Sequence, residues 1–208
     1  MPDKKKSVIF YVDGYNLYYG LKSKNWKKFY WLDIVGFFEK FLKPYQQLIE
    51  VNYFSAIPKN QGKQQRQELF FSANKLNSKF NLFLGKYFEK LVTCYNCGKT
   101  FKSYEEKQTD VHIATKMIRD VVLNKCEISI LVSADSDLIP SIDFIREYKP
   151  THKIFVYFPP DRISFDLKSS VNKYIKLENH LPKFHSSMLK DKIKLPNGYI
   201  IERPAKWK

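Results

Sequence analysis

Short apolar runs alternate with longer segments of helical character along this chain. Runs rich in β-branched and aromatic residues predict buried strands at residues 8–12, 48–56, 82–92, 127–132 and 153–158. Helical spacing or composition predicts helices at residues 32–42, 61–80, 109–123 and 138–148. Strands separated by helices favour an α/β fold in which a central, mainly parallel sheet lies between two helical layers.

Two segments fall outside this alternation. Residues 94–107 are polar and predict an inserted loop, and the chain from about residue 178 onward is rich in lysine and extended by prolines. A chain of 208 residues is long enough to bury one substantial core. We therefore expect one domain over residues 1–177, with an inserted loop at about 93–107, and a basic C-terminal extension over residues 178–208.

Acidic side chains follow two of the predicted strands directly. Asp13 ends the first strand, Asp135 and Asp137 follow the strand at 127–132, and Asp110 begins the helix before that strand. In open α/β sheets the functional crevice lies beyond the carboxyl ends of the strands. If the two strands are neighbours, the four carboxylates converge at one edge of the sheet.

Each carboxylate also has a structural explanation. Asp13-Gly14 is a common turn dipeptide, Asp137 could cap a helix that begins at Leu138, and Asp110 could complement the positive end of its own helix. Gathered together, however, the carboxylates would repel one another, and a divalent cation would relieve the repulsion. Carboxylate oxygens suit Mg²⁺ or Mn²⁺, which also bind phosphate oxygens.

The charge of the chain points to a polyanionic partner. Lys and Arg number 36 against 21 Asp and Glu, a net charge of +15, which favours nucleic acid over an anionic membrane surface. No apolar run reaches the roughly 18 residues of a membrane span, and no signal peptide is apparent. Three cysteines make no disulfide framework. We expect a cytoplasmic protein that binds nucleic acid and no membrane.

Three segments, in order, resemble the signature segments of the NYN family: "VDGYNLYYG", "EKQTDVHIATKMI" and "LVSADSDLIPSIDFI". The resemblance covers roughly residues 7–180. Members of this family are PIN-like ribonuclease domains with a Rossmann-type sheet and an acidic, metal-dependent site. The resemblance implies an endoribonuclease that hydrolyses phosphodiester bonds of single-stranded or loop RNA. The choice of RNA over DNA rests on the resemblance alone.

The resemblance also implies roles for individual residues. Asp13, Asp110 and Asp135 would bind Mg²⁺ or Mn²⁺. Asp137 would assist as a ligand, beside a ligand or as a helix cap, and Asn16 would orient a phosphate, a water or the Asp13 carboxylate. The catalytic candidates are therefore Asp13, Asn16, Asp110, Asp135 and Asp137, and Ser133 and Ser136 could add hydroxyl contacts.

One position departs from the family pattern. Many members carry a further acidic residue one and a half turns into the helix after the "TDV" segment, where this chain has Lys116. An ammonium group that points into the carboxylate site would weaken metal binding. One that faces solvent, or the phosphates of a bound nucleic acid, would not. The alternative function is therefore a catalytically weak nucleic-acid-binding module that acts through partners.

Basic and aromatic residues near the carboxylates are candidates for binding nucleic acid, by phosphate contact or by stacking on bases. They are Tyr15, Lys63, Arg66, Lys107 and Lys116. Tyr18 and Tyr19 could stack as well, although packing against the core explains them equally.

A cysteine pair stands in the segment "TCYNCGK". Cys94 and Cys97 supply half of a zinc site, whereas structural zinc needs four ligands. Cys126 and His112 are the nearest residues that could complete it, and both fall in or beside the helix predicted at 109–123. A degenerate loop, or a site shared between two chains of a homodimer, is favoured over a complete zinc site within one chain.

Overall fold

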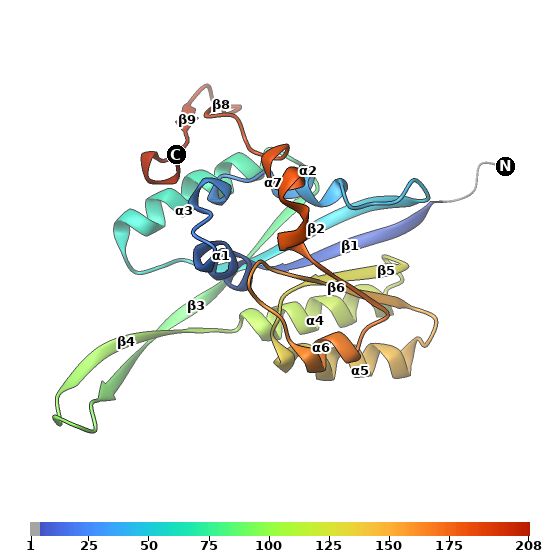
Figure 1. Cartoon of the computed structure of the whole chain (residues 1–208), viewed down its shortest axis with the longest axis horizontal. Coiled ribbons are helices and arrows are strands. Elements are labelled where there is room, and N and C mark those ends of the chain that lie inside the picture. Colours follow the sequence, from blue (N-terminus) through green and yellow to red (C-terminus); the bar gives the residue numbers. More distant parts are fainter. Residues whose placement is uncertain (1–4) are drawn as a thin grey trace.

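A sheet of seven strands forms the centre of the described structure, and helices cover both of its faces (Figure 1). The computed structural model describes residues 5–208, apart from the side chains of residues 103–106. The strands of the sheet are β1 (Lys6–Asp13), β2 (Gln46–Ala56), β3 (Phe80–Thr93), β4 (Thr100–Lys107), β5 (Ile128–Val132), β6 (Lys153–Phe158) and β7 (Lys173–Lys176). The helices are α1 (Gly14–Ser23), α2 (Ile34–Glu39), α3 (Gln61–Asn74), α4 (Thr109–Val122), α5 (Ile139–Tyr148), α6 (Phe165–Ser169) and α7 (Leu181–His185).

The strand order is β4-β3-β2-β1-β5-β6-β7. Neighbouring strands are parallel except β3 and β4, which pair in antiparallel fashion. The predicted α/β fold with a mainly parallel sheet is therefore confirmed. Because β1 lies between β2 and β5, the two strands that end in carboxylates are neighbours. Helices cover β1 on both sides, which explains why residues 8–12 are uniformly apolar.

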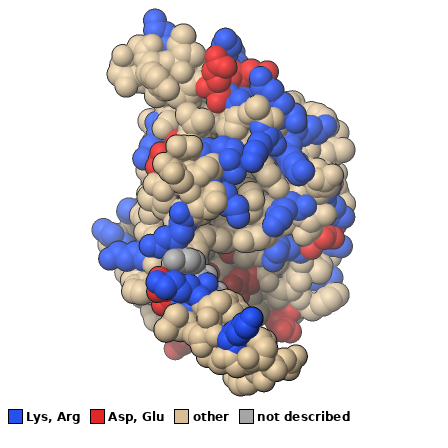
Figure 2. All heavy atoms as spheres, turned by 90° about the vertical axis from the view of Figure 1, so that its left-hand side faces the viewer, with Lys and Arg blue, Asp and Glu red and all other residues tan. Residues whose placement is uncertain are grey.

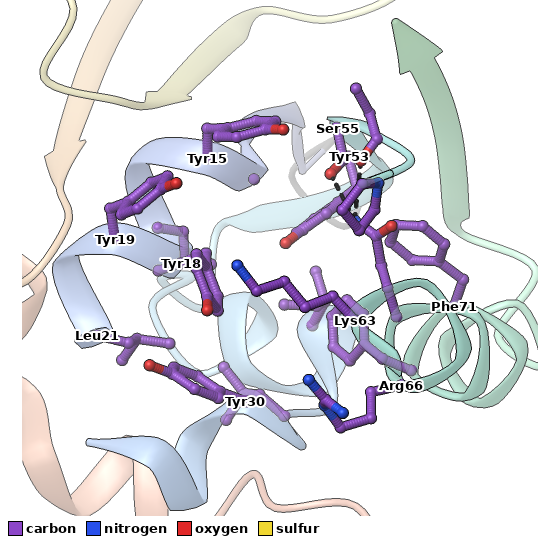
Figure 3. A pocket seen from close by; sticks show the side chains of 18 of the residues that line it. Tyr15, Tyr18, Tyr19, Leu21, Tyr30, Tyr53, Ser55, Lys63, Arg66 and Phe71 are labelled. Atoms are coloured by element: carbon purple, nitrogen blue, oxygen red, sulfur yellow. Dashed lines mark hydrogen bonds between the residues drawn. The ribbon is translucent and has the colours of Figure 1, made fainter. Parts of the chain in front are cut away.

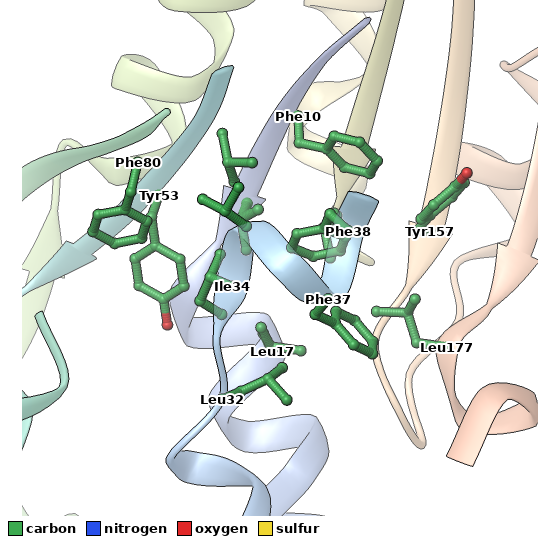
Figure 4. Packing of buried hydrophobic residues seen from close by; sticks show 14 of the residues in the cluster. Phe10, Leu17, Leu32, Ile34, Phe37, Phe38, Tyr53, Phe80, Tyr157 and Leu177 are labelled. Atoms are coloured by element: carbon green, nitrogen blue, oxygen red, sulfur yellow. The ribbon is translucent and has the colours of Figure 1, made fainter. Parts of the chain in front are cut away.

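Two hydrophobic cores lie on opposite faces of the sheet. On the face covered by α1, α2, α3 and α7, Phe10 stacks on Phe38 with ring centroids 4.6 Å apart (Figure 4). On the face covered by α4, α5 and α6, Tyr11 packs with Met117 and Ile142. Consecutive residues of β1 thus serve opposite cores, because side chains alternate across a strand.

A two-stranded arm leaves the sheet where the chain was expected to form an inserted loop (Figure 1). β3 pairs with β2 as far as Gly85, and from Lys86 onward it pairs with β4 as far as Thr93 and Thr100. The segment 100–107 is therefore a strand and not a loop. The first strand of the arm continues the strand predicted at residues 82–92, whereas β4 projects away from the core and lacks the apolar alternation that would predict a strand. We call residues 86–107 the arm.

The basic segment beyond residue 177 is folded onto the domain. It contains α7, a hairpin of β8 (Lys192–Lys194) and β9 (Ile200–Glu202), and short 3₁₀-helices at Leu177–His180 and Ala205–Trp207. Phe184 and Ile201 are buried in the core shared with α1 and α2. Among the described residues, no helix has the length and apolar character needed to cross a bilayer.

Candidate active site

Asp13 ends β1 and caps α1. Its Oδ1 accepts a hydrogen bond of 2.9 Å from the backbone N–H of Asn16, and its Oδ2 accepts one of 2.5 Å from the Asn16 side-chain amide. Gly14 allows this close passage, since a Cβ there would lie 2.6 Å from the carbonyl oxygen of Phe54. The Asp13-Gly14 dipeptide is therefore the start of a helix rather than a turn, and the carboxylate is held in one orientation.

Ser133 links Asp13 to the end of β5. The Ser133 hydroxyl donates a hydrogen bond of 2.8 Å to Asp13 Oδ2 and accepts one of 3.1 Å from the backbone N–H of Asp135. Asp135 caps a 3₁₀-helix at Ser136–Leu138, with its Oδ1 accepting a hydrogen bond of 2.9 Å from the Asp137 backbone N–H. The capping position considered for Asp137 is thus filled by Asp135, and the Asp137 side chain is exposed.

The electrostatics of Asp13 reflect its burial. Desolvation raises the pKa of the Asp13 carboxyl, and the negative charge of Asp135 raises it further, while the hydrogen bonds from Asn16 and Ser133 lower it. Asp13 is only 2 % exposed. An ionised carboxylate here would therefore be stabilised by a nearby cation.

Strand register places Asp110 at the same edge of the sheet. Lys107 pairs with Lys86, immediately beyond Gly85, which pairs with Ala56 at the carboxyl end of β2. α4 begins two residues after Lys107, so its half-buried Asp110 lies at the edge where β1 and β5 also end.

The donor set at this edge suits a hard divalent cation. In the part of the chain that the structure describes, no group of three or more His, Cys, Asp or Glu side chains lies close enough to hold a metal ion. Mg²⁺, however, is commonly bound by one or two carboxylates, with water and substrate phosphates completing the shell. Asp13 and Asp135 supply two carboxylates that interact electrostatically, so the oxygen donors fit such an ion.

Lys116 lies away from this edge, between α4 and the sheet. Its Nζ is 2.7 Å from Glu50 Oε1 and 2.5 Å from Asp120 Oδ2, and the side chain is 14 % exposed. Asp120 Oδ2 also accepts a hydrogen bond of 3.0 Å from the Tyr11 hydroxyl. Lys116 therefore neutralises two carboxylates of a polar network inside the domain.

An aromatic pocket lies beside Asp13, and we call it the tyrosine pocket (Figure 3). Its lining includes Tyr15, Tyr18, Tyr19, Tyr30, Tyr53, Tyr87, Ser55, Lys63, Arg66, Gln67 and Trp207. Three of the nucleic-acid-binding candidates, Tyr15, Lys63 and Arg66, thus meet in one place. No sequence pattern indicated Tyr30, Tyr53 or Trp207, because they come from separate segments; only the aromatic content of 16 % pointed to a role for aromatic residues.

Basic side chains cover much of the face that carries the arm, and acidic side chains lie in a hollow of the same face (Figure 2). Lys107 stands at the base of the arm, and Cys94 and Cys97 are at its tip. At that tip the backbone N–H of Gly98 donates to the Cys94 carbonyl, and Gly98 has φ +65°. Cys126 is buried beneath α4, in the core that also contains Tyr11, and is not at the tip.

Comparison with known proteins adds three findings. Residues 7–178 match the family model of the NYN domain. The chain is 27% identical over 174 residues to 6-hydroxy-3-succinoylpyridine 3-monooxygenase HspA of Pseudomonas putida (strain DSM 28022 / S16), covering 66% of this chain and 55% of that protein. The chain thus spans little more than half the length of this curated relative.

A crystal structure of a protein of unknown function from Vibrio parahaemolyticus RIMD 2210633 superposes with a TM-score of 0.57 and 16% identity. The superposition covers 85% of this chain and 96% of that one, and it shows the fold alone. With the family match spanning most of the sheet and both carboxylate-bearing strands, the chain belongs to the NYN domain family, whose PIN-like fold is generally that of a nuclease.

Proposed function

We propose that this protein is a metal-dependent endoribonuclease that hydrolyses phosphodiester bonds of single-stranded or loop RNA. The observation that carries the proposal is the hydrogen-bonded connection from Asp13 through Ser133 to Asp135 across two neighbouring strands. The proposed catalytic residues are Asp13, Asn16, Asp110, Asp135 and Asp137.

At this edge of the sheet, some residues orient the Asp13 carboxylate and others supply the negative charge that binds a cation. Asn16 and Ser133 fix the Asp13 carboxylate by three hydrogen bonds, so that it needs no rearrangement when substrate arrives. Asp13 and Asp135 would bind Mg²⁺ or Mn²⁺ directly, and Asp110, at the same edge, would add negative charge that favours the ion. When bound, such a cation supplies Lewis acidity toward a phosphate oxygen and toward water.

Basic residues around the edge would position the polyanion. Lys63 and Arg66 on α3 and Lys107 at the base of the arm flank the carboxylates, and phosphate contacts of this kind fix the register of a nucleic acid. Lys116 is left out of this surface, because it is already paired with Glu50 and Asp120.

The test is cleavage of an end-labelled RNA that contains single-stranded and hairpin regions, with Mg²⁺, Mn²⁺ or EDTA. We expect cleavage with a divalent cation and none with EDTA. Asp13→Asn and Asp135→Asn should each lower the rate by about 100-fold or more, the scale of losing one preorganised electrostatic group. Asp143→Asn is the matched control, because Asp143 is an exposed carboxylate on α5, and it should leave the rate unchanged.

RNA binding measured in EDTA separates the proposal from its alternative. Retained binding with cleavage lost in Asp13→Asn and Asp135→Asn supports a nuclease. Tight binding by the unaltered protein, without cleavage under any of the three conditions, would instead establish a nucleic-acid-binding module that acts through partners.

A further inference from the structure

The tyrosine pocket has one aromatic wall and one cationic wall. Tyr18 and Tyr30 stand on one side with ring centroids 4.9 Å apart and planes at 39°. Lys63 and Arg66 come from α3 on the other side, and their nitrogen atoms reach toward these rings (Figure 3). This combination suits a ligand that has a planar ring and an attached anionic group, because rings stack on aromatic faces while cations bind anions.

The pocket is large enough for such a ring and has a fixed wall. Its volume is about 180 Å³, against the roughly 10–15 Å³ that one water molecule requires on the same kind of measure. The Gln67 side-chain amide donates to Ser55 Oγ at 3.0 Å and to the Ala56 carbonyl at 3.2 Å, so this wall is held in place. Burial raises the pKa of Tyr18 and raises that of Tyr30 to about 12, so both hydroxyls stay neutral.

The pocket opens next to the carboxylate edge. Gly14 and Tyr15, which directly follow Asp13, belong to its lining. Tyr53, another lining residue, packs against the residue that follows Asp13, since a Cβ added to Gly14 would lie 2.6 Å from the Tyr53 ring. A ligand in the pocket would therefore lie next to the end of β1 that carries Asp13.

We infer that the tyrosine pocket binds one unpaired base of the nucleic acid strand, with Lys63 and Arg66 on an adjacent phosphate. The inference rests on the proposed function and deepens it, because it names the subsite that selects an unpaired nucleotide next to the bond to be cut. The excess of 36 basic over 21 acidic residues favours a nucleotide within a polyanion over a free heteroaromatic acid. Extrusion of a base into a pocket requires that it be unpaired or easily unpaired.

The first test measures binding of a fluorescein-labelled 12-nucleotide single-stranded RNA by anisotropy in EDTA, where cleavage does not interfere. Tyr18→Leu keeps the apolar bulk but removes the ring, and we expect its affinity to fall by about 5-fold or more, the lower end of base–aromatic stacking. Tyr18→Phe should restore affinity to within 2-fold of the unaltered protein. Tyr148→Leu, at an exposed tyrosine of α5 on the other face of the sheet, should have no effect.

The second test changes the RNA and so does not depend on how a variant folds. A single abasic nucleotide is moved along the 12-mer, and we expect one position to lose affinity by at least about 5-fold. That loss should vanish in Tyr18→Leu, since coupled partners are not additive. Equal losses at every position, or the same loss in Tyr18→Leu, would overturn the inference.

Failure of the inference and failure of the nuclease proposal give different results. Cleavage that depends on Asp13, with binding indifferent to Tyr18 and to the abasic nucleotide, rejects the pocket and keeps the nuclease. If an abasic nucleotide at one position lowers RNA affinity but no metal supports cleavage, the base-binding role of the pocket stands and the nuclease proposal is wrong. If nicotinate, a free heteroaromatic acid, saturates the pocket while Tyr18→Leu leaves RNA affinity unchanged, the occupant is a small molecule and the inference is wrong.

Discussion

At the scale of single residues, Asp13 serves the fold and the proposed chemistry with the same two oxygens. Its side chain caps α1 through Asn16 and accepts from Ser133. Replacement by Asn would keep a capping oxygen, because Asn and Asp cap helices about equally well. The Asp13→Asn variant therefore removes the charge with little cost to the helix, which makes it a clean test of the site.

His152 provides a prediction about stability and pH. It is 4 % exposed, and its Nε2 lies 2.9 Å from the Ser129 hydroxyl. Burial lowers the pKa of His152 to about 4, with the charge of Lys149 acting in the same direction. An unfolded histidine titrates near 6.5, so the unfolded state takes up the proton first as the pH falls. Stability that is complete above pH 6.5 is thus lost progressively down to pH 4.

The size of this effect follows from the two pKa values. At pH 5 the contribution is a loss of about 2 kcal/mol relative to neutral pH. Urea unfolding at pH 7.5 and pH 5 should show that His152→Gln, which keeps a donor near Ser129, loses less stability on acidification than the unaltered protein by that amount. The exposed His185 supplies the control; an equal change in His185→Gln would contradict the assignment to His152.

At the scale of elements, α4 is joined to the sheet by buried charges as well as by apolar packing. Lys116 bridges Glu50 of β2 and Asp120 of α4, and Asp120 is fully buried. Burial tends to raise the pKa of Glu50, but hydrogen bonds from Lys116 and Asn52 lower it overall. Both carboxylates thus share the ammonium group of Lys116 as their nearest cation.

Lys116→Met is therefore expected to destabilise the protein by about 3–5 kcal/mol, because it takes the nearest cation from the buried Asp120 and from the partly buried Glu50. Denaturant unfolding measures this. Lys125→Met is the matched control: Lys125 lies 3.4 Å from the same Asp120 but is 43 % exposed, and its loss should cost about 1 kcal/mol or less.

RNA affinity distinguishes this structural role from the binding role that the sequence suggested for Lys116. Measured well below the melting temperature, the affinity of Lys116→Met should match that of the unaltered protein. If Lys116→Met instead lost RNA affinity while keeping its stability, Lys116 would be a residue that contacts the nucleic acid and not a structural one.

Which elements the sequence could predict depends on their surroundings. β1 and β5 were predictable because helices cover both of their faces, which demands uninterrupted apolar runs, and their carboxylates follow at once. β4 was not, since it pairs only with β3 and projects into solvent. The tyrosine pocket was not predictable either, because Tyr18, Tyr53 and Trp207 come together only through tertiary packing.

At the scale of the whole molecule, the basic C-terminal segment belongs to the core and does not trail from it. Phe184 is fully buried, with its ring centroid 4.4 Å from that of Phe37 and 5.1 Å from that of Phe29. Trp207 reaches the tyrosine pocket and packs on Tyr30 with ring centroids 5.8 Å apart. The last residues of the chain thus support helices near its beginning.

Phe184→Ala should destabilise the protein by about 3–5 kcal/mol, the usual cost of removing a buried aromatic ring. Tyr199→Ala, in the same segment but 63 % exposed, should change stability by about 0.5 kcal/mol or less. Denaturant unfolding of both variants is the measurement, and similar values for the two would show that the segment is not part of the cooperative core.

The position of β1 in the middle of the sheet has a consequence for the growing chain on the ribosome. β1 ends at Asp13, but its neighbour β5 begins only at Ile128. At a synthesis rate of roughly 5–20 residues per second, the edge of β1 that pairs with β5 remains unpaired for on the order of 6 to 23 s. During that time an apolar strand edge is open to other nascent chains, so we expect the yield of native protein to depend on chaperones that shield it.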